Sequence, residues 1–233
     1  KRSPQLPTTS PSSPGTYLEA YRRATRQADQ ILCITVSSSV SAMYDSARAA
    51  MELAREALPG TRIHVLDSQA AAMAQGFVVL QAVRAAEQMD LPEVVAAAQR
   101  AMPRVTLVCF LDTLYYLARS GRVPKAAAWA ASLLQVKPII QMRQGSIELV
   151  SRTRTRTRAT ARVLDLVERE VDSRPVNVAV MHAHALAEAE ELRAQVSARL
   201  RCQELHVTEF TPVMGCYTGP GLLGLAYYLP EGA

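Results

Sequence analysis

Residues 31–58 read ILCITVSSSVSAMYDSARAAMELAREAL, and this stretch decides the fold class. Residues 31–36 form a mostly apolar run with polar neighbours, which is typical of a strand buried on both faces. After the serine-rich residues 37–41, a helical pattern runs from about residue 42 until Pro59-Gly60 ends it. A buried strand followed directly by a helix predicts one unit of a parallel α/β sheet.

The same alternation fills the first part of the chain. Residues 1–16 are predicted to be a loop because prolines interrupt them, and residues 17–29 have helical spacing. A strand is expected at residues 63–66, then helices at residues 70–89 and from Asp90 to Met102-Pro103. We therefore predict a Rossmann-like, doubly wound parallel α/β domain over residues 1–103.

From Val105 onward the pattern changes. Residues 138–143 and 147–152 flank Gln144-Gly145, which is a hairpin signal. The other expected elements alternate irregularly: strands at 105–110, 176–181, 204–210 and 222–229, and helices at 113–119, 124–134, 159–171 and 186–200. This predicts an α+β domain with a mixed sheet over residues 104–233, and the boundary near residue 103 carries an error of about ten residues.

The composition excludes several protein classes. Hydrophobic residues make up 49% of the 233 residues and charged residues 20%, so a sizeable core is expected. The four cysteines form no Cys-x-x-Cys pair, so we expect free thiols and no zinc site. The sequence contains no apolar run of about 18 residues and no signal-peptide pattern, which favours a cytoplasmic protein.

The serine loop, residues 37–41, is the main candidate site. It lies between a strand end and a helix start, where free backbone N–H groups and the helix dipole favour an anion. Hydroxyls of Ser37, Ser38 and Ser41 would add donors for a carboxylate or a phosphate. The alternative is that one of these serines only caps the helix.

Three other segments are weaker candidates. Residues 8–15 are rich in hydroxyls and either face the serine loop or form a flexible tail. Arg122 follows Gly121, and an arginine fixed by a glycine turn can pair with a carboxylate or a phosphate; the alternative, which is the commoner case, is a plain surface arginine. Residues 215–221, which contain Gly219-Pro220-Gly221, allow close approach of the backbone to a ligand or form only a turn.

Arginine alternates with threonine from Arg152 to Arg158. If this segment is extended, all four arginines lie on one face. Binding of nucleic acid, a charged strand edge, or a docking surface for an acidic protein would each explain the pattern. His182 and His184 lack an accompanying ligand set, and no catalytic motif is present, so we predict no enzyme activity, no metal and no cofactor.

Several short segments, taken in order, resemble the DegV family of bacterial fatty-acid-binding proteins. They cover nearly the whole chain: Thr9-Ser10 with Ser13-Pro14-Gly15, Ser37 to Tyr44, Val65 to Ser68, Asp112 to Leu117 with Ser120 to Val123, Lys137-Pro138-Ile139, Arg154-Thr155, and Thr218 to Gly221. Each segment alone is only a weak sign of the family, but seven segments in the family order are a specific one.

The resemblance implies two domains with a long-chain fatty acid in the cleft between them. In the family, positions that match Thr9 and Ser41 hold the carboxylate, and Arg122 falls near the head group. Ser10, Ser37 and Ser38 belong to the same loops, and Tyr217 stands where the family has a histidine that bonds the ligand. The resemblance also implies a separate fatty acid kinase subunit that meets the surface around Arg154, while peripheral membrane contact is compatible with a lipid ligand and nucleic acid is not expected.

The sequence departs from the family pattern in four places. Pro11-Ser12 replaces Gln-Pro, Ala42-Met43 replaces Gly-Thr, and Tyr217 replaces the usual histidine. The family's opening strand with its Asp-Ser has no counterpart here, so either the chain is a fragment or the first domain lacks its N-terminal part. Expected walls of the acyl tunnel are apolar residues from both halves: Met43, Met73, Leu114, Leu117, Leu133, Leu134 and Ile139.

Overall fold

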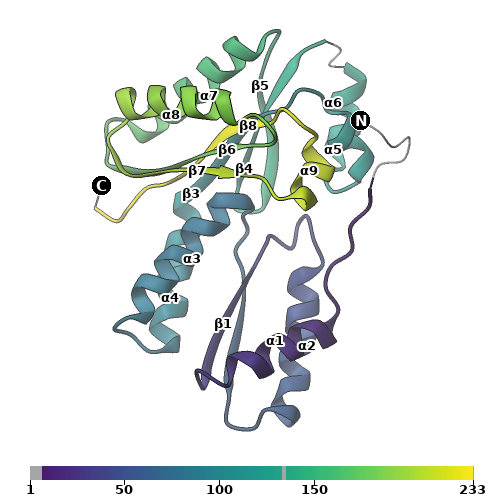
Figure 1. Ribbon diagram of the computed structural model, residues 1–233, viewed down its shortest axis with the longest axis vertical. Helices are drawn as coiled ribbons and strands as arrows, with labels where there is room; N and C mark the ends of the chain where they lie inside the picture. Colours follow the sequence, from purple (N-terminus) through teal and green to yellow (C-terminus); the bar gives the residue numbers. More distant parts are fainter. Residues whose placement is uncertain (1–6, 133–134, 233) are drawn as a thin grey trace.

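The computed structural model describes residues 7–132 and 135–232. Two sheets organise these residues: a parallel two-stranded sheet, here called the smaller sheet, and a mixed six-stranded sheet, the larger sheet. The smaller sheet and helices α1 and α2 lie below the larger sheet in Figure 1. The predicted α/β class, with one parallel and one mixed part, is therefore confirmed.

Helix α1 (Pro14–Ala24) begins and ends earlier than predicted. Ser13 caps it, since the Ser13 hydroxyl accepts a hydrogen bond from the Thr16 amide at 3.3 Å. Pro14 fits the first helical position because its missing N–H has no helical partner there. The loop predicted up to residue 16 is thus wrong by three residues, and the helix predicted to Asp29 stops at Ala24 because residues 25–27 form a turn.

The smaller sheet pairs β1 (Gln30–Thr35) with β2 (Arg62–Asp67), and α2 (Met43–Ala57) connects them. Alternate residues of β1 pack into two different apolar clusters. Ile31 and Cys33 pack with α1 and α2, whereas Leu32 and Ile34 pack toward α3 and the larger sheet. The strand is therefore covered on both faces, as its continuous apolar run predicted.

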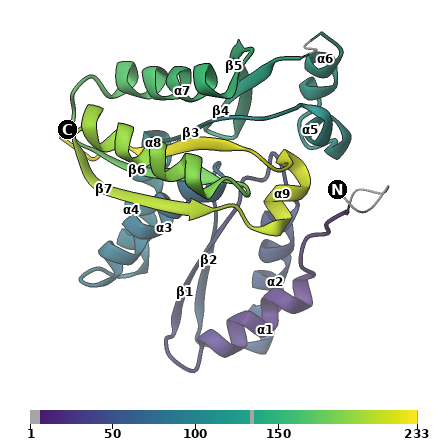
Figure 2. The same cartoon turned by 45° about the horizontal axis from the view of Figure 1, so that its top comes forward.

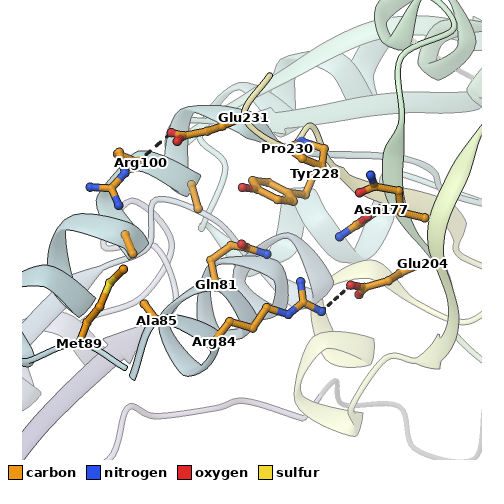
Figure 3. A pocket seen from close by; sticks show the side chains of 13 residues that line it. Gln81, Arg84, Ala85, Met89, Arg100, Asn177, Glu204, Tyr228, Pro230 and Glu231 are labelled. Carbon is orange, nitrogen blue, oxygen red and sulfur yellow. Dashed lines mark hydrogen bonds and ion pairs between the residues drawn. The ribbon is translucent and has the colours of Figure 1, made fainter. Parts of the chain in front are cut away.

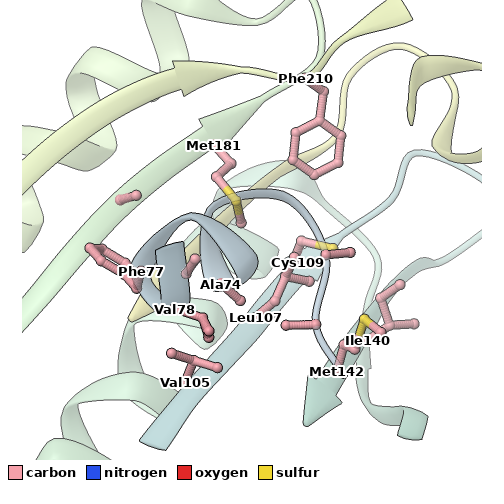
Figure 4. Packing of buried hydrophobic residues seen from close by; sticks show 14 of the residues in the cluster. Ala74, Phe77, Val78, Val105, Leu107, Cys109, Ile140, Met142, Met181 and Phe210 are labelled. Atoms are coloured by element: carbon pink, nitrogen blue, oxygen red, sulfur yellow. The ribbon is translucent and has the colours of Figure 1, made fainter. Parts of the chain in front are cut away.

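Helices α3 (Ala72–Ala86) and α4 (Leu91–Ala101) form a pair that precedes a short 3₁₀ turn, η1 (Met102–Arg104). Asp90 and Glu93 form a capping box at the start of α4, so the predicted N-cap is confirmed. Figure 4 shows Ala74, Phe77 and Val78 of α3 packed against the larger sheet. The domain boundary near residue 103 stays a prediction: the larger sheet begins at Val105, and the preceding α3 covers it.

The larger sheet has the strand order β5-β4-β3-β8-β6-β7. The chain forms β3, then the hairpin of β4 and β5, and β8 returns to lie between β3 and β6. Gln144 and Gly145 have φ values of 47° and 76°, which confirms the predicted hairpin turn. The strand bounds are β3 (Val105–Phe110), β4 (Lys137–Arg143), β5 (Ser146–Thr153), β6 (Val176–His182), β7 (Cys202–Glu209) and β8 (Leu223–Tyr228).

The face of the larger sheet opposite α3 is covered by α7 (Arg156–Val171) and α8 (Leu186–Arg199). Three short helices gather at one end of the sheet, as Figures 1 and 2 both show: α5 (Tyr115–Ser120), α6 (Lys125–Ser132) and α9 (Pro212–Thr218). No helix was predicted where α9 lies. Among the described residues, no helix combines the length and the apolar character needed to cross a membrane.

Candidate functional site

The serine loop connects β1 to α2, as predicted, and its first hydroxyls are used within the protein. Ser37 is buried, and its hydroxyl is hydrogen-bonded to the Ser39 hydroxyl at 2.8 Å. The Ser38 hydroxyl and amide both donate to the carboxylate of Asp67, which also accepts from the Gln69 amide. Ser37 and Ser38 thus shape the loop, and Asp67 places a negative charge beside Ser38.

Ser41 and the start of α2 offer the donors that the loop leaves available. The Ser41 hydroxyl accepts from the Met43 amide at 3.3 Å, so its own proton remains available to a ligand. Ala42 occupies the N-cap position of α2 and supplies no side-chain cap. Apart from the Met43 amide, the amides of the first helical turn are therefore available to an anion, as is the positive end of the helix dipole.

The tip of the β4–β5 hairpin holds the serine loop. The Gly145 amide donates to the Gln69 carbonyl at 2.7 Å, and the Ser39 hydroxyl donates to the Gly145 carbonyl at 2.8 Å. A side chain at Gly145 would lie 3.5 Å from the Ser37 hydroxyl. These bonds attach the loop to the larger sheet, and apart from the hairpin no local pattern predicted them.

Thr9 and Ser10 lie in the segment that precedes α1. This segment runs from α1 toward the end of the larger sheet where α5 and α9 lie (Figures 1 and 2). Thr9 is half-buried and Ser10 is exposed, and neither side chain hydrogen-bonds to another residue within the described ranges. Their hydroxyls are thus available as donors.

Arg122 and Tyr217, predicted from separate segments, lie together. Gly121 ends α5 in a left-handed conformation, and the Arg122 guanidinium donates to the Ser120 carbonyl at 2.9 Å. The same guanidinium lies 5.1 Å from the centroid of the Tyr217 ring on α9, which is a cation–π contact. The packing of α5 on α9 therefore brings these two candidates to one surface.

The Arg152–Arg158 run is not extended throughout, so the condition for a common face of four arginines is not met. β5 ends at Thr153, Thr155 caps α7, and α7 begins at Arg156. Arg154 and Arg158 are exposed, whereas the Arg156 side chain turns inward. The helical cap breaks the two-residue period on which the shared face depended.

Arg156 links three segments that are far apart in the sequence and meet at one end of the larger sheet. Its guanidinium pairs with Asp112 at 2.6 Å and with Glu188 of α8, and it donates to the Gly221 carbonyl at 2.7 Å. Lys137 pairs with the same Asp112 at 2.9 Å. Although partial burial raises the pKa of Asp112, hydrogen bonds from Lys137 and Arg156 outweigh burial and hold that pKa below its ordinary value.

The expected tunnel walls divide between two faces of the larger sheet. Leu114 and Leu117 are buried in the cluster that includes α3, and Met73 packs against this cluster. Ile139 faces the opposite side, where it packs with α7, so its assignment as a wall is wrong. Met43 is half-buried, and Leu133 and Leu134 lie outside the described residues.

Two cavities in the described part of the chain are lined by none of the predicted head-group residues. One of about 460 Å³ lies beside α3 and α4, and one of about 590 Å³ is lined by His182 and His184. The His182 Nδ1 atom accepts from the Ala185 amide at 3.4 Å, which is a structural role. No cluster of three or more metal-ligating side chains occurs among the residues that the structure describes.

Comparison with known proteins supports the resemblance. Residues 1–229 match the family model described as "Uncharacterised protein, DegV family". A DegV domain-containing protein of Streptomyces coelicolor is 37% identical over 221 residues, which cover 94% of this chain and 77% of that protein. Protein DegV of Bacillus subtilis is 30% identical over 230 residues, which cover 97% of this chain and 80% of that protein.

Two solved structures are similar over almost the whole chain. A fatty-acid-binding DegV family protein from Thermus thermophilus has a TM-score of 0.87 and 29% identity, and the match covers 97% of this chain and 80% of that chain. A stearic-acid-binding protein from Eubacterium ventriosum has a TM-score of 0.88 and 27% identity, with 96% and 78% covered. The chain belongs to the DegV family.

Proposed function

We propose that this protein binds a long-chain fatty acid with the carboxylate near the serine loop and the acyl chain between the smaller and larger sheets. The observation that carries the proposal is the position of the serine loop. It combines available donors at Ser41 and the α2 N-terminus with an apolar cluster that runs from β1 to Leu114 and Leu117. Similar structures from two other bacteria bind fatty acids, which agrees with this ligand.

The proposed roles follow from the chemistry of a buried acid. An unpaired carboxylate away from water is costly, so Thr9, Ser41 and the α2 amides would supply its hydrogen bonds. Ser10 would contribute from the same segment as Thr9, and Ser37 and Ser38 would hold the loop shape. Arg122 and Tyr217 would lie at the entrance of the fatty acid site. Each buried methylene of the acyl chain would contribute about 0.8 kcal/mol, so chain length would dominate affinity.

The second part of the proposal concerns a partner. We infer that the protein is a non-enzymatic, cytoplasmic carrier that presents the fatty carboxylate to a separate fatty acid kinase subunit. Arg154 is exposed and has no ion-pair partner among the described residues, so its charge is available to an acidic surface. Peripheral contact with a membrane would supply the lipid.

Mass spectrometry of the purified protein tests the ligand. Under native conditions we expect a bound long-chain fatty acid, because the protein offers an apolar cluster for an acyl chain and hydrogen-bond donors for a carboxylate. The double substitution Thr9→Val with Ser41→Ala should weaken fatty acid binding by at least about tenfold, since the carboxylate would lose two donors. A folded protein that carries no fatty acid and takes up none would refute the proposal.

A matched control separates the site from general effects. Thr157→Val with Ser197→Ala makes the same chemical changes at exposed positions of α7 and α8 and should leave binding unchanged. The kinase role needs its own assay, which follows phosphorylation of the bound acid by added fatty acid kinase. Arg154→Ala should slow that transfer while fatty acid affinity stays constant, and equal rates would exclude Arg154 from the contact.

A further inference from the structure

One side chain, that of Arg156, contacts several segments at the end of the larger sheet where α5 and α9 lie. Its guanidinium lies 5.0 Å from the centroid of the Phe110 ring at the end of β3. It pairs with Asp112 at 2.6 Å and with Glu188 of α8, and it donates to the Gly221 carbonyl at 2.7 Å. The side chain is only 26% exposed. A planar guanidinium held on several sides in this way keeps one position and orientation.

Two partners of Arg156 flank the helices that lead to Arg122 and Tyr217. Asp112 lies between β3 and α5, and Arg122 follows the residue that ends α5. Tyr217 lies in α9, and Gly221 lies between α9 and β8. Helices α5 and α9 pack against each other, and the Arg122 guanidinium lies 5.1 Å from the centroid of the Tyr217 ring. Arg156 therefore holds the chain on both sides of this pair, before α5 and after α9.

The segment that follows α9 has little room to move. Gly219 and Gly221 have φ values of 73° and 86°, a region in which a residue with a Cβ is strained. A Cβ at Gly219 would overlap the Tyr116 ring of α5. A Cβ at Gly221 would lie 3.0 Å from the Arg156 Nη1 atom, and the Gly221 amide donates to the Ala183 carbonyl at 2.8 Å. The segment is therefore held between α5, the end of β6 and the Arg156 guanidinium.

We propose that Arg156 is a positioning residue for the carboxylate of the fatty acid. This inference rests on the proposed function, because it takes Arg122 and Tyr217 to lie at the entrance of the fatty acid site. Arg156 acts without touching the ligand: by fixing the start of α5 and the end of α9, it keeps the Arg122 guanidinium and the Tyr217 ring together. Groups that are already in place bind a ligand more tightly, because binding then carries no cost of ordering them.

Competition binding of stearic acid and of stearyl alcohol, which share one chain length, separates effects on the head group from effects on the acyl chain. Arg156→Gln should weaken binding of the acid about tenfold and change binding of the alcohol by less than about twofold. Arg156→Lys keeps the charge but loses the planar fork of donors, so it should restore only part of the affinity. It also carries the comparison if Arg156→Gln does not fold. Equal weakening of both ligands, or of neither, would overturn the positioning role.

The matched control is Arg84→Gln. Arg84 of α3 pairs with Glu204 of β7 at the opposite end of the larger sheet, as Figure 3 shows. The substitution thus removes an arginine–carboxylate pair between two elements, as Arg156→Gln does, but it leaves α5 and α9 untouched. It should change the affinity for neither ligand.

Hydrogen exchange of the ligand-free protein measures the positioning without any fatty acid. The Gly219 amide donates to the Gly215 carbonyl at 2.9 Å, so its exchange reports on the end of α9. In Arg156→Gln the Gly219 and Gly221 amides should exchange about tenfold faster, while the amides of β6 and β8 keep their protection. Wild-type protein that binds neither ligand would refute the proposed function. Normal binding of stearic acid by wild type and Arg156→Gln alike, with unchanged exchange, would refute only the role of Arg156.

Discussion

The larger and smaller sheets differ in how completely their strands are buried. Every residue of β3, β6 and β8 is buried, whereas five of the six residues of β1 are only partly buried. Three helices, α3, α7 and α8, cover the larger sheet directly, while the smaller sheet has two strands and a small cluster around Tyr21. The difference places most of the folding stability in the larger sheet and leaves the serine loop on the part that opens most easily.

If the larger sheet holds most of the folding stability, its centre should not tolerate a cavity. Phe110 is fully buried on β3, so Phe110→Ala should lower the free energy of unfolding by about 3–5 kcal/mol. Denaturant unfolding followed by circular dichroism measures this loss. The control Leu53→Ala, at a position 54% exposed on α2, should change it by less than about 0.5 kcal/mol.

Added volume at the same sheet should also destabilise the fold. An alanine Cβ at Gly224 would lie 2.3 Å from the Cys109 Cβ and 2.4 Å from the Val108 carbonyl oxygen. Since backbone atoms must move, Gly224→Ala should cost about 1–3 kcal/mol in the same unfolding measurement. Gly15→Ala meets only the Ser13 hydroxyl at 3.7 Å, so it should be neutral or slightly stabilising. Equal effects at the two glycines would contradict the packing described for β8.

The smaller sheet should respond less to the loss of apolar volume. Leu32 on β1 is only partly buried, so Leu32→Ala should cost about 1 kcal/mol, below the range for a fully buried leucine. Hydrogen exchange measures the free energy of local opening in each sheet. This free energy should be lower for the amides of β1 than for those of β6 and β8. Equal protection of the two sheets would show that they unfold only as one unit.

The smallest expected effect concerns acid. The pKa of Asp112 is depressed in the folded protein, so its contribution to stability is fully present above the range where an ordinary aspartate titrates. That contribution is lost as the pH falls through the folded pKa. Asp112→Asn should therefore flatten the stability profile of the larger sheet below that range. Identical acid profiles of the two proteins would show that Lys137 and Arg156 do not stabilise the carboxylate.

Local signals in the sequence predicted most elements. The apolar runs of β1 and β3, the capping residue Asp90 and the turn at Gln144-Gly145 each act through nearby residues, so each could be identified without the structure. The position of the serine loop before α2 followed from the same signals. Helix α9 was missed although Thr211 and Pro212 form a favourable helix start, because its seven residues also include a glycine and β-branched residues of low helix propensity.

Features that depend on distant contacts could not be predicted. The place of β8 between β3 and β6 is decided by pairing across most of the chain. The orientation of Arg156 depends on Thr155 starting a helix and on Asp112 and Glu188, which lie far away in the sequence. The predicted residues Thr9 and Ser41 therefore remain assignments from local patterns and resemblance, and ligand measurements will decide them.

The main-chain hydrogen bonds at the hairpin tip do not depend on which side chains the serine loop carries. Gly145 joins the serine loop through its own amide and carbonyl, and one of its partners is the backbone carbonyl of Gln69. Main-chain bonds survive exchange of side chains so long as the backbone keeps its shape. The hydroxyl side chains of the serine loop can therefore be exchanged without separating the loop from its support.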